Sequence, residues 1–183
     1  AKTLAATVAR YLAEVAAPTE HLSLLRWQIA EAHRLDLRET MPGHLTTSAI
    51  VLSPDHAQIM IIDHITIGRW LQPGGHYESS PSFHLSAQRE AEEETGVTGL
   101  KLHPWHQGGD LPFVIDSHDV PGKKSRNEPP HIHHDLQYLF LADPNQPLTA
   151  QLDEVNAAKW QSVEMLWEFA LKAAERLKAV AVP

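Results

Sequence analysis

Four glutamates gather within five consecutive positions, at Glu90, Glu92, Glu93 and Glu94. On a helix each residue turns by about 100°, so the first, third and fourth share an arc of about 100° while Glu92 points away. Each close pair of like charges costs roughly a few tenths of a kcal/mol. A divalent cation reverses that cost, because Mg²⁺ and Mn²⁺ bind hard oxygen ligands and keep positions for water and phosphate. The spacing permits a metal site, and equally a solvated acidic face with an Arg89–Glu93 pair.

A second set of residues that could bind phosphate or metal is rich in histidine. The chain has 13 histidines, more than its tryptophans, tyrosines and phenylalanines combined. His118 ends the segment FVIDSH, and the segment PPHIHHDLQYLF carries His131, His133, His134 and Asp135. On a strand His131, His133 and Asp135 share one face, and His134 takes the other. These histidines could donate to phosphate oxygens or bind a further metal, or they could be half-buried residues bonded to the backbone or to Asp135.

The residues around the glutamates resemble the Nudix box, the signature of the Nudix hydrolase family. That pattern is Gly, five residues, Glu, seven residues, Arg-Glu, an aliphatic residue, any residue, Glu-Glu, any residue, Gly and an aliphatic residue. In GGHYESSPSFHLSAQREAEEETGV, Gly75 opens the pattern and the run from Arg89 to Val97 completes it in register. Pro81 replaces the first Glu of the box, although Glu78 sits where many members carry an acid. That first acid helps to hold the loop and helix in the family, so its loss concerns rate and metal number more than fold.

The resemblance implies an enzyme, a metal-dependent Nudix pyrophosphohydrolase. In this family water attacks a phosphorus of a phosphoanhydride in a nucleoside diphosphate linked to another group, and Mg²⁺ or Mn²⁺ offsets the charge on the oxygens. The implied metal ligands are the carbonyl of Gly74 and the side chains of Glu90, Glu93 and Glu94. The implied catalytic residues are Arg89, Glu90 and Glu93, with Arg89 orienting Glu90 through a charge-assisted hydrogen bond.

The residues expected to contact substrate rest on a narrower resemblance. PGGH before the box, an Asp-x-His motif at Asp116–His118 and the strand HDLQYLF are similar to those of a subset of Nudix proteins with unassigned substrates. Trp70 could stack on a base or support the core. From these features we expect a small nucleotide-derived diphosphate to contact Arg69, Trp70, His76, His118 and His133.

Two other functions stay open. A Nudix-fold nucleotide-binding or regulatory module with little turnover is favoured by Pro81, whereas the retained Arg89 and three glutamates argue against it. A histidine-bound transition-metal protein would make the glutamate face incidental. The general base varies within the family, and Glu128, in the polar loop DVPGKKSRNEPP, is the acid outside the box that we would test first. A solvated loop residue is the other interpretation, and the more common one for such a position.

The elements that must position these residues follow from the hydrophobic pattern. Residues 1–40 predict a helical extension, and residues 41–183 predict a Nudix hydrolase domain. Strands are expected at 44–53, 57–64, 68–71, 100–105, 111–118, 134–142 and 156–163, with helices at 82–95 and 163–180. Leu166, Trp167, Phe169, Leu171 and Leu177 should form the buried stripe of the last helix. The fold class expected is α/β, a Nudix-type α/β/α sandwich with a mixed sheet.

Composition limits the partners. The chain has 183 residues with a formal net charge of −8, which argues against a nucleic-acid polymer as ligand. The sequence has no apolar run long enough for a membrane span, and its first residues predict an amphipathic helix and not a signal peptide. The absence of cysteine fits a reducing compartment, so we expect a cytoplasmic protein. The N-terminal helices could form a homodimer contact.

Overall fold

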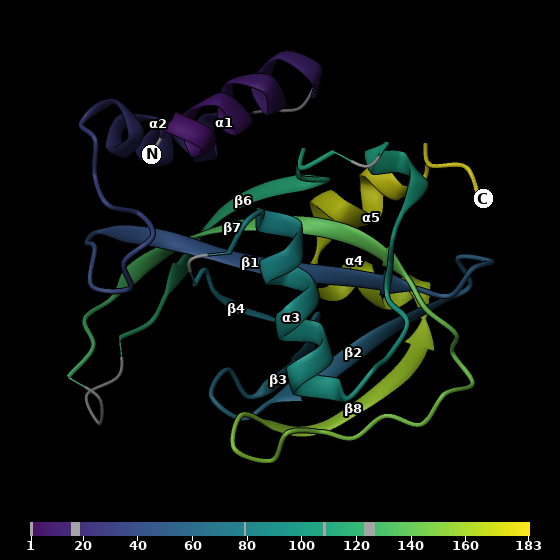
Figure 1. Cartoon of the computed structure of the whole chain (residues 1–183). Coiled ribbons are helices and arrows are strands. Elements are labelled where there is room, and N and C mark those ends of the chain that lie inside the picture. The colour runs from purple at the N-terminus through teal and green to yellow at the C-terminus, as the bar shows by residue number, and fades with distance from the viewer. Residues whose placement is uncertain (1, 16–18, 79, 108, 123–126) are drawn as a thin grey trace.

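The computed structural model describes residues 2–15, 19–78, 80–107, 109–122 and 127–183 (Figure 1). These residues form a mixed eight-stranded sheet. Its strands are β1 (Gly43–Leu52), β2 (Gln58–His64), β3 (Arg69–Leu71), β4 (Gly74–His76), β5 (Lys101–Leu102), β6 (Val114–Val120), β7 (His131–Leu141) and β8 (Val155–Ser162). The helices are α1 (Lys2–Glu14), α2 (Ser23–Ala30), α3 (Phe83–Thr95), α4 (Leu166–Phe169) and α5 (Leu171–Leu177), with 3₁₀ turns η1 (Glu20–Leu22), η2 (Pro104–His106) and η4 (Val163–Met165).

Strand β1 is central to the sheet. It pairs in parallel with β7 along its whole length, from Gly43 opposite Ile132 to Leu52 opposite Leu141. It also pairs antiparallel with β2 and with the short β4, while β6 pairs antiparallel with the other side of β7. All ten residues of β1 are buried, as expected for a strand covered on both faces.

Helices cover both faces of the sheet. In Figure 1, α3 lies on one face, and α4 and α5 lie on the other. One core cluster joins α1, α2 and α3 to side chains such as Ala49 and Tyr138. A second cluster joins α4 and α5 to Ile50 and Leu139. Neighbouring residues of a strand therefore face different cores, and the predicted α/β/α sandwich with a mixed sheet is confirmed.

The C-terminal segment differs from the single helix expected at 163–180. It comprises η4, α4 and α5, and Ala170 interrupts the helices with a φ of −139° and a ψ of 57°. The expected apolar stripe is therefore wrong in part. Leu166 is buried, but Trp167 and Leu171 are 37% and 54% exposed, and the small residues Ala173 and Ala174 face the core instead.

The N-terminal helices share the core of the sheet. Apolar side chains of this segment, namely Leu4, Val8, Tyr11, Val15, Leu22 and Leu25, are buried in the cluster that also contains Ala49. The amide of Gln28 on α2 donates to the Gly43 carbonyl at 2.9 Å, and its oxygen lies 2.8 Å from Nε2 of His134.

None of the helices in the described ranges has the length and apolar character needed to cross a membrane. The boundary between residues 40 and 41 stays a prediction.

Candidate active site

The glutamates of α3 divide between a buried and an exposed face. Glu90 is 8% exposed and Glu94 only 1%, because the helix presents both carboxylates to β4. Glu93 is half-exposed beside them, and Glu92 turns to solvent, where its carboxylate accepts a hydrogen bond from Gln88. The helical arc predicted from the spacing is present, with Glu92 outside it.

Two consecutive glycines of β4 allow these carboxylates to reach the sheet. The backbone N–H of Gly74 donates to Oε2 of Glu94 at 2.9 Å. A Cβ on Gly75 would lie 2.5 Å from Oε2 of Glu90, and one on Gly74 would lie 2.6 Å from the carbonyl oxygen of Thr47. Any larger residue at position 75 would therefore occupy the place of the Glu90 carboxylate.

Arg89 connects three of the acids. Its guanidinium donates to Glu90 at 2.6 Å and to Glu93 at 2.7 Å, and it lies 3.8 Å from the exposed Glu78. The predicted orientation of Glu90 by Arg89 thus has a direct bond, and the Arg89–Glu93 pair is present as well. Among the residues that the structure describes, this one arginine faces several carboxylates, so negative charge is in excess there.

Burial makes this negative charge costly. Removal from water raises the pKa of Glu90 from 4.5 to about 7, although the charge of Arg89 opposes the shift. Burial likewise raises the pKa of Glu94 to about 8, against the stabilising Gly74 hydrogen bond. Repulsion between the acids adds to both shifts. A divalent cation would supply the missing positive charge, and the oxygen donor set is the one that Mg²⁺ and Mn²⁺ prefer.

Glu154 is a further acid that acts on these carboxylates, and it was not predicted from the sequence. Its charge raises the pKa of both Glu90 and Glu94, and its backbone carbonyl accepts from Ile65 at 3.1 Å. It precedes β8, far along the chain from the box, so no spacing pattern linked it to α3. Glu128, the acid singled out earlier, instead lies 3.3 Å from Arg38.

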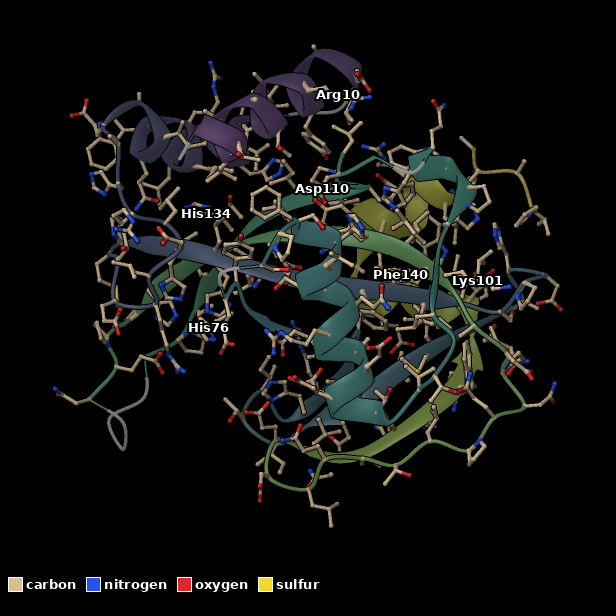
Figure 2. The ribbon with its side chains drawn as sticks, in the orientation of Figure 1. Arg10, His76, Lys101, Asp110, His134 and Phe140 are labelled. Atoms are coloured by element: carbon tan, nitrogen blue, oxygen red, sulfur yellow. The ribbon has the colours of Figure 1, made fainter. Side chains whose placement is uncertain are left out.

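A distant aspartate holds the start of α3, close to Pro81. The carboxylate of Asp110 accepts from the backbone N–H groups of Phe83 and His84, each at 2.9 Å, and lies 2.8 Å from the His84 ring. Figure 2 shows Asp110 beside this end of the helix. Within the described residues the Ser82 side chain makes no capping bond. Asp110 therefore stabilises the start of α3. An acid in the preceding loop would otherwise contribute to the same stabilisation.

Histidines from three strands form a cluster on the opposite side of β4. The histidine cluster consists of His44 (β1), His76 (β4), and His131 and His133 (β7). The His44 ring centroid lies 4.9 to 5.1 Å from those of the other three. Burial is the main cause that lowers the pKa of His76 to about 4 and of His133 to about 2, so both rings are neutral at pH 7. The structure brings together His76 and His133 as predicted, whereas His44 was missed.

Polar side chains continue from this cluster along the sheet. Asp135, which is buried, accepts from Thr46 at 3.0 Å and from Ser48 at 2.6 Å. His118 lies opposite His133 in the β6–β7 pairing, and its ring nitrogen is 3.1 Å from Asp116. That hydrogen bond raises the pKa of His118. As predicted from strand alternation, His134 points to the other face, toward α2.

Arg69 and Trp70 lie on β3, which pairs antiparallel with β2. Arg69 is exposed. Trp70 packs against the core cluster below α4 and α5, and the ammonium group of Lys159 sits 4.0 Å from its ring centroid. This packing favours the core-supporting role for Trp70, and substrate contact by either residue stays a prediction.

Two comparisons with known sequences agree with this geometry. The NUDIX domain model matches residues 42–181. A relative from Lactococcus lactis subsp. cremoris (strain MG1363), described as a probable DHNTP pyrophosphohydrolase, is 30% identical over 125 residues, which is 68% of this chain and 71% of the relative.

Solved structures share the fold. A Nudix-family hydrolase from Clostridium perfringens has a TM-score of 0.50 and 23% identity, covering 75% of this chain and 98% of that chain. A C. elegans Ap4A hydrolase in a binary complex has a TM-score of 0.52 and 14% identity, covering 74% of this chain and 95% of that chain. The predicted enzyme class, a Nudix pyrophosphohydrolase, is thereby confirmed. With its box in register on α3 and the domain model spanning the whole sheet, this chain belongs to the Nudix hydrolase family.

Proposed function

We propose that this Nudix hydrolase requires a divalent metal and cleaves a phosphoanhydride bond in a small nucleoside-diphosphate-linked molecule. The observation that carries the proposal is the buried pair Glu90 and Glu94, held against β4 where the described residues place one arginine among several acids. Buried carboxylates with so little compensating charge are poorly stable on their own. A bound cation converts the same arrangement into a stable site.

The proposed ligands of Mg²⁺ or Mn²⁺ are the Gly74 carbonyl, Glu90, Glu93 and Glu94. Support comes from the donor chemistry and from the close approach of β4 to α3 that Gly75 permits. When bound, the ion would neutralise charge on the phosphoanhydride oxygens. Glu154 acts electrostatically on Glu90 and Glu94, and we propose that it lies near the metal ligands.

The protein groups have separate roles in this scheme. Arg89 holds Glu90 and Glu93 in place through two short hydrogen bonds, so that neither carboxylate must reorganise during the reaction. Glu90 and Glu93 are the proposed catalytic carboxylates. Either carboxylate could accept the proton of the attacking water.

The substrate is proposed at the level of chemical class. The described function of the Lactococcus relative makes DHNTP one compound to test, alongside nucleoside diphosphates linked to sugars or to a second nucleoside. Arg69, Trp70, His76, His118 and His133 are the proposed contacts. His118 is the best placed of the histidines to meet an anion, because its ring is nearly half exposed and its bond to Asp116 favours the charged form.

A binding or regulatory module with little turnover is the second function to test. Pro81 favours it, because the box lacks its first acid. The Asp110 cap weakens that argument, since the helix start is held without an acid at position 81. A cytoplasmic location and a homodimer also stay predictions from the sequence.

A release assay with the full chain tests the proposal. Phosphate and pyrophosphate release would be measured with Mg²⁺ or Mn²⁺ against this panel, for wild type, Glu93→Gln and the exposed control Glu92→Gln. We expect turnover of at least one compound, a loss of about a hundredfold or more in Glu93→Gln, and wild-type rates in Glu92→Gln. Tight binding without turnover of any compound would instead favour the regulatory module.

A further inference from the structure

The histidine cluster results from how three neighbouring strands align. His44 on β1 lies directly opposite His133 in the parallel β1–β7 pairing. His76 lies opposite Thr46, two residues along the same face of β1. One ring nitrogen from each of these three histidines lies within 4.8 Å of the other two. Figure 2 shows His76 at the end of the sheet that lies away from Lys101 and Phe140.

One ring nitrogen of His44 and one of His76, Nε2 in each case, lack hydrogen-bond partners among the described residues. Nδ1 of His44 is 3.3 Å from the Thr40 carbonyl, so Nδ1–H donates there and Nε2 carries the lone pair. His44 is only 1% exposed. Its Nε2 and that of His76 are buried and have no hydrogen-bond partner among the residues that the structure describes. Buried polar atoms of this kind are costly unless something accepts or supplies the missing interaction.

Hydrogen bonds to neighbouring groups fix the tautomer of the third ring, His133. Nδ1 of His131 lies 3.0 Å from the Pro129 carbonyl and donates to it, so Nε2 of His131 is an acceptor. Nε2 of His133 lies 3.1 Å from that acceptor and is the donor. His133 therefore keeps its lone pair on Nδ1. Such outer hydrogen bonds fix the tautomers of histidines that bind metals, as the Thr40 carbonyl does for His44.

We propose that His44, His76 and His133 form a second metal site, which binds a transition metal such as Zn²⁺ through ring nitrogens; in this role His76 and His133 bind the metal in place of the substrate contact proposed above. Imidazole nitrogen suits Zn²⁺, Ni²⁺ and Cu²⁺, whereas Mg²⁺ prefers oxygen. A zinc ion bonded to nitrogen at about 2.0–2.1 Å holds its tetrahedral ligands about 3.3 Å apart. The three ring nitrogens, which now lie within 4.8 Å of one another, would have to move closer together on binding.

This metal would clamp β4 onto β1 and β7. The strand β4 carries His76 toward the histidine cluster, while its preceding residues Gly74 and Gly75 contact Glu94 and Glu90. Fixing His76 to His44 and His133 would therefore steady the strand against which the glutamates are held. The histidine site itself requires neither the glutamates nor any substrate, so its test is independent of the proposed hydrolase chemistry.

The test is metal binding by the full chain after chelation and dialysis. Excess Mg²⁺ is included to occupy the oxygen site, and Co²⁺ is added as a spectroscopic probe. We expect one Co²⁺ per chain, with the visible absorption of a four-coordinate nitrogen-bound ion, and its displacement by one equivalent of Zn²⁺. Failure of wild type to bind either ion under these conditions overturns the proposal.

Variants locate the site. His76 is half-buried. Both His76→Asn and His44→Gln are expected to weaken Co²⁺ and Zn²⁺ binding at least tenfold. The matched control is His56→Asn, which disrupts another close histidine pair, His56 with His103 at 3.0 Å. Circular dichroism establishes folding, and His76→Asn decides the outcome if His44→Gln does not fold. Equal affinity in wild type, His76→Asn and His56→Asn would show that the ion binds elsewhere and would overturn the assignment.

Discussion

Glu90 and Glu94 link the stability of the metal-free protein to pH. Their pKa values in the folded protein are about 7 and about 8, against 4.5 for the unfolded reference. Between those values the folded state keeps protons that the unfolded chain has released, so the free energy of unfolding falls as pH rises. The two groups therefore contribute most stability below about pH 4.5, and this contribution is lost as pH rises through about 8.

Thermal unfolding in the presence of a chelator measures this effect. We expect the part of Tm that depends on these carboxylates to decline from about pH 5 to about pH 8.5, and Mg²⁺ to restore stability mainly at the alkaline end. The double variant Glu90→Gln with Glu94→Gln should show a flatter profile. An unchanged pH slope in that variant would mean that other groups control the dependence.

Alanine substitutions at the adjacent residues Gly75 and Gly74 are expected to have different effects. A Cβ at position 75 meets the carboxylate of Glu90, which is the end of a flexible side chain, whereas a Cβ at position 74 meets backbone of β1. Gly75→Ala should therefore displace Glu90 and reduce Mn²⁺ affinity roughly 10-fold or more with little loss of Tm. Gly74→Ala should mainly lower Tm. Isothermal titration and thermal unfolding of both variants separate the two effects, and similar losses of Tm in both would contradict this account of Gly75.

The start of α3 depends on Asp110 more than on its own loop. Two backbone N–H groups of the first turn donate to this carboxylate. Replacing such a cap by alanine costs about 0.5–2 kcal/mol, so Asp110→Ala should lower the free energy of unfolding by that amount. Asp110→Asn keeps an acceptor oxygen and should lose less. Urea unfolding of the two variants provides the measurement, and equal stability of Asp110→Ala and wild type would show that the cap contributes nothing.

Local sequence signals predicted several of the regular elements. The strand expected at 100–105 was wrong in part, because only Lys101–Leu102 is a strand and the 3₁₀ turn η2, which begins at Pro104, follows it. The Thr, Ile and Val content of 44–53 predicted β1 to within a residue at each end, and Gly96 ends α3 in the left-handed conformation, with a φ of 66°. β4 was not predicted, because three residues with two glycines have no strand propensity. Their pairing with β1 is a tertiary contact. The break at Ala170 was hidden for a similar reason, since the helical pattern continues through it.

The predictable part of the site was the part encoded in one segment. Arg89, Glu90, Glu93 and Glu94 belong to a single helix, so their spacing gives their geometry. Glu154 joins them only through the fold. His44 shows the same limit, because one histidine in an apolar strand gives no sign that β4 and β7 bring further rings beside it.

The whole molecule places two donor sets of different chemistry on either side of β4. Oxygen donors from α3 lie on one side, and nitrogen donors from β1, β4 and β7 lie on the other. The formal net charge of −8 disfavours anionic substrates at long range, so the proposed diphosphate would need a cation at the site. On this proposal, the acids of α3 would serve to hold that cation.

A crystal structure grown with Mn²⁺ and a non-hydrolysable nucleoside-diphosphate analogue tests that claim directly. Anomalous scattering locates the manganese. We predict a peak among Glu90, Glu93 and Glu94, with a phosphate oxygen of the analogue bound to the same ion. Glutamate side chains turned to solvent with no manganese between them, while the analogue is bound, would contradict the account.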